Sequence, residues 1–220
     1  MFGTALLAGA LMMSPAIEKW DLKPGIAPKA KASLAVIVEA ATGDGDHRAE
    51  FTVVREIGDP DGANHKATYL WKGLTVDGQE VGEDTAWDVT VGPRGAVLAT
   101  TDMMGDDIRR MLSPMAFVFP EKPVGEGDKW TAEVRPYKDK DDFLLTYSYE
   151  VKGVETLDGS EALKVALTLV EKSTDGMNGE GTWWIGKDGS VLKFEMKVKN
   201  WIVPMAGSDL IEAKIAGKKG

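Results

Sequence analysis

Hydrophobic and polar residues alternate along most of the chain from Ala32 onward. In the stretch 143–151 one face holds Phe143, Leu145, Tyr147, Tyr149 and Val151. In the stretch 191–200 lysines and a glutamate separate Leu192, Phe194, Met196 and Val198. The runs 87–91 and 163–169 follow the same period of two. This period is typical of antiparallel strands that bury one face and leave the other in water.

Turn signals separate these runs. Asp-Gly pairs occur at 61–62, 77–78, 158–159, 175–176 and 188–189, and most of them lie between alternating segments. Asp-Gly is favoured in tight hairpin turns because both residues tolerate a positive φ. The spacing predicts a mainly β protein of about eight to ten strands, joined mostly as a meander. We expect a single curved antiparallel sheet or a half-open β-barrel.

One segment, at about 102–113, has helical spacing instead. Its apolar residues fall on one side of a helix, and Pro114 is placed to end it. Those residues are Met104, Ile108, Met111 and Leu112. Asp102 can cap the start, while early Asp106 and Asp107 and late Arg109 and Arg110 complement the helix dipole. A short mid-chain helix is therefore predicted.

A weak internal repeat indicates the domain organisation. Stretches 86–103 and 182–198 share a Trp-bearing strand, a glycine turn and a Val-Leu pair that opens the next strand. We expect one β domain over 33–204, made of two similar units, 33–103 and 142–200. The helix and a Pro/Gly-rich corner would join the units. Residues 17–32 read as a linker, and 205–220 as a C-terminal tail.

That tail has a helical alternative. Residues 205–216 can form a short second helix with an apolar side made of Leu210, Ile211 and Ile215.

The first sixteen residues carry no charge. Phe2 to Met13 are apolar or small, and this run is shorter than the roughly 20 residues that span a bilayer as a helix. Ser14 and Ala16 supply small residues at a cleavage site, although no Lys or Arg follows Met1. We expect 1–16 to be a signal peptide, with a buried N-terminal helix as the alternative. The protein is then expected to be secreted or periplasmic, without a transmembrane span.

The stretch "FVFPEKPVGEGDKW" at 117–130 raises the choice between a ligand loop and a corner of the fold. Pro120 and Pro123 cannot donate ladder hydrogen bonds, so the chain must leave the sheet there. Gly125 and Gly127 permit a tight reversal, and Asp128 can accept from nearby backbone amides. Trp130 would then anchor the next strand. We interpret the stretch as a structural corner.

Charge and composition exclude several classes of function. A net charge of -9 repels nucleic acid, and the absence of cysteine excludes disulfides and thiolate sites. His47 and His65 lie in no metal-ligand spacing, and "GEGDK" at 125–129 fails both common phosphate-loop patterns. Aspartates cluster at 44–46, 59–61 and 139–142 in turn-like sequence. We expect a non-enzymatic protein with no metal and no cofactor.

Seven tryptophans are a high count for 220 residues. Trp183 and Trp184 are adjacent, so in a strand they point to opposite faces. One of them must face away from the main core, where it either lines a groove for a sugar or lipid or packs under a neighbour. We favour packing.

The corner also carries a family resemblance. Its residues fit the pattern F-P-x-x-P-V-x-x-G-D-x-W, through Phe119, Pro120, Pro123, Val124, Gly127, Asp128 and Trp130. Together with the Tyr-rich and Gly-x-Gly hairpins that follow, it resembles a bacterial family of secreted and lipoprotein domains of unknown function. The likeness covers most of 33–200. It implies a half-open barrel wrapped on a helix, similar to envelope lipoprotein carriers that hold acyl chains. This chain departs from the lipoprotein members because it has no lipobox cysteine.

The functional hypothesis is an exported envelope protein that binds an apolar ligand, such as an acyl chain or lipid, in its concave sheet face. The candidate binding residues are Phe143, Leu145, Tyr147, Tyr149, Leu192, Phe194 and Met196. One short helix cannot cover so wide a sheet, so some apolar surface should remain open unless a terminal segment covers it. The alternative is a protein-interaction or scaffold module without a cavity, whose partner is another envelope protein. A hydrolase is the weakest alternative, because it needs converging carboxylates or a Ser-His contact in a cleft.

Overall fold

The structure, a computed structural model, describes residues 18–25, 27–43, 45–100, 105–135, 144–202 and 210–220. It is mainly β, as the alternation predicts, with more strands than the eight to ten expected. The first half holds β1 (Lys31–Thr42), β2 (Gly45–Asp61), β3 (Asn64–Val76), β4 (Gln79–Glu80), β5 (Thr85–Val91) and β6 (Val97–Thr100). The second half holds β7 (Lys129–Val134), β8 (Leu145–Leu157), β9 (Ser160–Glu171), β10 (Asn178–Gly186), β11 (Val191–Ile202) and β12 (Leu210–Lys219).

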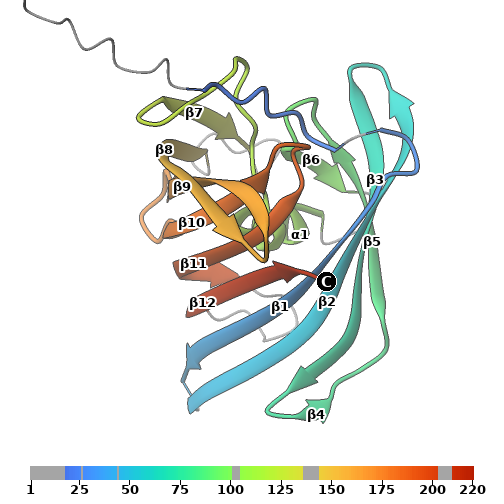
Figure 1. The fold of residues 1–220 in the computed structure, drawn as a ribbon. Coiled ribbons are helices and arrows are strands. Elements are labelled where there is room, and N and C mark those ends of the chain that lie inside the picture. The colour runs from blue at the N-terminus through green and yellow to red at the C-terminus, as the bar shows by residue number, and fades with distance from the viewer. Residues whose placement is uncertain (1–17, 26, 44, 101–104, 136–143, 203–209) are drawn as a thin grey trace, which may run out of the picture.

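The described strands form one antiparallel sheet in the order β6-β5-β3-β2-β1-β12-β11-β10-β9-β8-β7, with β4 paired to β3. Each half of the chain is a meander, and the two halves meet where β1 pairs with β12. The sheet curls into a nearly closed barrel around α1 (Gly105–Leu112), as Figure 1 shows. The edge strands β6 and β7 stay unpaired with each other, so the gap between them must be filled by other parts of the chain.

Alternation places one face of every long strand inside the barrel. The inner face of β9 carries Leu163, Val165, Leu167 and Leu169, none more than 1% exposed. On β5 the buried residues are Trp87, Val89 and Val91. Two of the Asp-Gly turns have a positive φ at both residues, Asp77-Gly78 and Asp158-Gly159, as the hairpin interpretation requires.

Tight curvature is accommodated by glycines on the inner face. Gly217 of β12 pairs directly with Phe194 of β11, and a Cβ added at Gly217 would lie 2.1 Å from the Phe194 ring. That ring stacks on Trp183 with centroids 4.6 Å apart. Gly181 stands in the same relation to Met196. Large side chains therefore lie across glycines of the neighbouring strand, which fills the barrel without forcing the strands apart.

The mid-chain helix is present, and it continues into the 3₁₀ helix η1 (Ser113–Met115). Ile108, Met111 and Leu112 are buried as predicted, whereas Asp102 and Met104 lie outside the described residues. Arg110 lies in the last turn of the helix, as expected, and its side chain is buried. It is 4% exposed, and its Nη2 lies 2.6 Å from Glu171 Oε2 on the inner face of β9. This ion pair ties the helix to the sheet.

The helical alternative for 205–216 is wrong over 210–216, the part of it that the structure describes. Residues Leu210–Lys219 form β12, which completes the sheet between β1 and β11. Its alternating Ile211, Ala213 and Ile215 are buried, so the segment expected to be a tail is a central strand. The signal-peptide prediction for 1–16 falls outside the described residues. Within the described ranges, no helix has the length and apolar character needed to cross a membrane.

Candidate functional site

The gap between the edge strands is filled by residues 113–128, here called the closing segment. On one side, the Phe119 amide donates to the Arg94 carbonyl at 2.8 Å in the turn between β5 and β6. The Arg94 Nε donates back to the Phe119 carbonyl at 2.6 Å. On the other side, the Val118 amide donates to the Tyr149 hydroxyl at 2.9 Å. The closing segment is thus bonded to both halves of the sheet.

Two further bonds hold this segment against β7 and β8. The Trp130 indole donates to the Val118 carbonyl at 2.9 Å, and the Tyr147 hydroxyl donates to the Ser113 carbonyl at 3.1 Å. The Trp130 and Tyr149 rings stack with centroids 4.7 Å apart. Burial raises the pKa of Tyr147 and Tyr149, so both keep the hydroxyl proton at neutral pH. The polar groups of Tyr147, Tyr149 and Trp130 thus hold the backbone of the closing segment in place.

The Pro/Gly corner ends in a tight turn around Asp128. The Gly125 amide donates to the Asp128 carboxylate at 2.9 Å, and the Asp128 amide donates to the Gly125 carbonyl at 3.0 Å. Gly127 has φ +82 and donates to the Val151 carbonyl. The carboxylate also lies 3.2 Å from Lys19 Nζ. The amide of Gly125 and then the Lys19 ammonium lower the pKa of Asp128.

Replacing Asp128 by alanine is expected to lower the melting temperature by a few degrees at neutral pH and to leave ligand affinity unchanged. A lowered pKa means that the folded state binds the proton more weakly than the unfolded chain does. The carboxylate's contribution is therefore full at neutral pH and is lost as the pH falls below about 4, the usual pKa of aspartate. Thermal melts at pH 7 and pH 3 check this. A gap between the wild type and Asp128→Ala that does not shrink in acid would contradict it.

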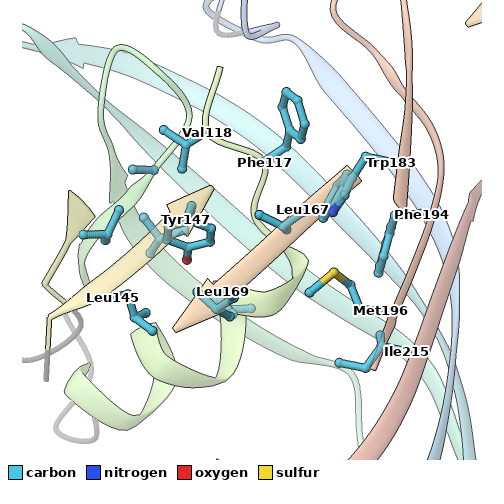
Figure 2. Close-up of a cluster of buried hydrophobic side chains, with 14 of the residues drawn as sticks. Phe117, Val118, Leu145, Tyr147, Leu167, Leu169, Trp183, Phe194, Met196 and Ile215 are labelled. Atoms are coloured by element: carbon cyan, nitrogen blue, oxygen red, sulfur yellow. The ribbon is translucent and has the colours of Figure 1, made fainter. Parts of the chain in front are cut away.

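The predicted binding residues lie mostly in the core. Leu145, Tyr147, Tyr149, Phe194 and Met196 are at most 3% exposed, and Figure 2 shows labelled members of this set pointing into one packed cluster. A bulge pairs Ile185 with Val191, and Val191 rather than Leu192 packs against the core. Phe143 lies outside the described residues. Of the six that the structure describes, only Phe194 also lines the cavity described next.

An apolar cavity of about 260 Å³ lies between the closing segment and the inner face of the first strands. Its walls come from β1 and β2, the end of α1, the closing segment and β11. The apolar lining residues are Leu34, Val36, Val53, Leu112, Met115, Ala116, Phe117, Phe119, Val191 and Phe194. Lys31, Asp188 and Lys219 also line it and are exposed, so one end of the cavity reaches the surface. Side chains do not fill this cavity, whereas the inner faces of β8 and β9 are fully buried in the core.

Residues 18–25 form a strap near this open end. Trp20 pairs with Val124 through two backbone hydrogen bonds of 2.8 and 3.0 Å, and Trp20 and Leu22 are buried. Gly25 lines the cavity. A Cβ at Gly189 would fall 1.8 Å from the Lys23 carbonyl oxygen, so the strap packs closely on the turn between β10 and β11. The segment expected to be a linker is therefore attached to the domain and borders the cavity.

The concave face predicted from the sequence lies on β8 and β11 and meets this cavity through Phe194. Phe117 and Phe119 were assigned only a corner role, and the residues of β1 and β2 were not singled out. Alternation in 33–57 carried a usable signal for the apolar wall, because Leu34, Val36 and Val53 share the inner face. What sequence could not provide was the path of the closing segment across these strands.

Other features singled out in the sequence lie away from the cavity. Trp183 is in the core, while Trp184 faces outward at 7% exposed. Trp184 lies under Lys164 and Lys193 and donates to Glu155 at 2.7 Å, so it is packed as we favoured. His47 lies on β2, not in a loop, and its Nδ1 is 2.8 Å from Asp77 Oδ2. His65 likewise lies on a strand, β3.

Comparison with known proteins adds little to this picture. No protein-family model matches the chain, and no curated protein matches it. Among solved structures it is similar to a "putative exported protein with YmcC-like fold" from Bacteroides fragilis. The identity is 11%, the TM-score is 0.36, and the alignment covers 88% of this chain and 97% of that one. At this level the likeness carries no argument about function, and the family resemblance of the corner stays a prediction.

Proposed function

We propose that the protein is an exported, non-enzymatic binding protein of the bacterial envelope that holds a single apolar chain, such as an acyl chain, inside its barrel. The observation that carries this proposal is the apolar cavity of about 260 Å³ behind the closing segment. Export is supported by the uncharged, apolar or small residues of Phe2–Met13 and the small residues Ser14 and Ala16 after them.

The shape of the cavity supports one chain rather than a bulky ligand. Small-molecule pockets commonly enclose about 300–1,000 Å³, so this cavity lies just below the usual range. Its walls are predominantly aliphatic and aromatic, which favours transfer of a hydrocarbon from water at about 25 cal/mol per Å² buried. A sterol or a two-chain lipid would not fit without movement of the strap or the closing segment.

Filling the cavity is expected to abolish binding. Leu34 lies on the inner face of β1, lines the cavity and is only half-buried, so Leu34→Trp can place an indole in the space. Affinity for 1-decanol and decanoate, measured by isothermal titration calorimetry, should fall by about ten-fold or more. Stability should change little, because the new ring fills existing space.

The matched control is Val170→Trp. Val170 is 51% exposed on the outer face of β9, so an indole there leaves the cavity unaltered and binding should stay at the wild-type level. The proposal fails if neither ligand binds the wild type. It also fails if both ligands bind Leu34→Trp as well as they bind the wild type. A protein partner captured without ligand uptake would favour the interaction-module alternative.

A further inference from the structure

Arg55 points into the mouth of the cavity. It lies on β2 between Val53 and Ile57, which are 8% and 1% exposed, so alternation directs its side chain to the inner face. Its strand neighbours are Ala32 and Tyr69, and all three line the cavity. Arg55 is half-buried, so its guanidinium reaches water at the mouth while its aliphatic stem borders the apolar wall.

Within the described part of the chain, Arg55 forms no ion pair with a carboxylate. Its one bond is from Nη2 to the Gly25 carbonyl at 3.3 Å, which leaves most of its five N–H donors unused. Arg48, on the outer face of the same strand, behaves differently and lies 2.7 Å from Glu50 and 3.2 Å from Glu39. In a chain with net charge -9, an inward arginine without an acidic partner indicates a site for an external anion.

The rest of the mouth adds positive charge. Lys219, on the inner face of β12 opposite Leu34, also lines the cavity. The third cation, Lys31, is paired with Glu56 at 2.8 Å. Among the described lining residues the carboxylate is Asp188, which accepts from the Ser190 amide at 2.9 Å. Hydrogen bonds from Ser190 and then the nearby Lys219 ammonium lower the pKa of Asp188, so Lys219 is shared with this carboxylate. The mouth therefore presents Arg55 to a ligand, with Lys219 beside it, next to an apolar interior.

We propose that the ligand is an amphipathic anion, with a single alkyl chain in the cavity and a carboxylate or phosphate head bound by Arg55, assisted by Lys219. This inference rests on the proposed function and specifies its ligand class. The guanidinium can donate two parallel N–H bonds to either head group, and such charge-assisted bonds are stronger than neutral ones. The cavity binds the alkyl chain of the ligand, and the cationic residues at its mouth select an anionic head group.

The test compares three ten-carbon probes, decanoate, decyl phosphate and 1-decanol, by isothermal titration calorimetry with the full chain. The wild type should bind at least one anion about ten-fold or more tightly than the alcohol. Arg55→Gln should remove that preference and leave the affinity for 1-decanol unchanged. Arg48→Gln, on the outer face of the same strand, should keep the preference. The relative affinity of decanoate and decyl phosphate distinguishes the two head groups.

The outcomes separate this inference from the function on which it rests. Equal binding of all three probes by the wild type would overturn the anionic ligand and leave the apolar cavity standing. A preference that survives in Arg55→Gln would overturn the role of Arg55. If no probe binds, both ideas fall together, and the proposed function falls first. Circular dichroism melts of each variant show whether a loss of binding comes from unfolding.

Discussion

Replacing Glu171 by glutamine is expected to lower the free energy of unfolding by about 3–5 kcal/mol, because it leaves Arg110 charged and buried without its partner. Glu171 and Arg110 are 3% and 4% exposed. Among the described residues, the Arg110 Nη2 has one further and longer bond, 3.3 Å to the Asn200 carbonyl. Glu171 Oε2 also accepts from the Met177 amide at 2.7 Å, which a glutamine oxygen can still do. Urea denaturation at neutral pH measures the change.

A double variant separates two effects of Glu171→Gln: the cost of leaving Arg110 buried without a carboxylate, and the loss of the attraction between the two charges. Arg110→Met together with Glu171→Gln removes both charges and keeps an acceptor for Met177. It should recover most of the stability that Glu171→Gln loses, since neutral replacements of a buried pair are often close to neutral in effect. A double variant as unstable as Glu171→Gln would contradict this account. The helix would then be held mainly by Met111 and Leu112.

Replacing Gly217 by alanine is expected to destabilise the barrel by about 1–3 kcal/mol through overpacking. The added Cβ would lie 2.1 Å from the Phe194 ring, and that ring is confined by the stacked Trp183. Its other neighbours are inner-face core, so the ring cannot move without displacing a packed side chain. Thermal and urea unfolding both report the effect.

Two further variants test the cause. Gly43→Ala is the control, because a Cβ there meets nothing within 4 Å, and it should be close to neutral. Phe194→Leu introduced into Gly217→Ala should restore part of the lost stability, because a smaller side chain no longer overlaps the methyl group. If the double variant is instead as unstable as the sum of the single changes, the clash between these two positions is not the cause.

The alternation of residues was enough to predict the fold class and the buried face of several strands. The strands at 87–91 and 163–169 and the helix around Ile108 and Met111 follow directly from local periodicity. The strand at Leu210–Lys219 was missed because its Leu210, Ile211 and Ile215 also fit a helix over that short length. Only pairing with both β1 and β11 decides its structure, and that pairing is long-range.

The cavity was harder to predict for the same reason. It exists because Phe117 and Phe119 lie opposite β1 and β2, which are distant in sequence, and because Arg94 and Tyr149 bond the closing segment in place. The corner motif indicated that the chain leaves the sheet, but not where it then runs. The inward direction of Arg55 could not be predicted from its neighbours in sequence. A charged residue that interrupts an alternating apolar face is equally typical of the end of a strand.

Native mass spectrometry tests the central claim, a cavity that holds an apolar chain, most directly. The full chain would be purified without detergent from the envelope fraction of cells that make it. The account predicts a bound species with the mass of one single-chain amphipath, which Leu34→Trp lacks and Val170→Trp retains. A mass equal to that of the chain alone, with no uptake of decanoate or 1-decanol on titration, would contradict it.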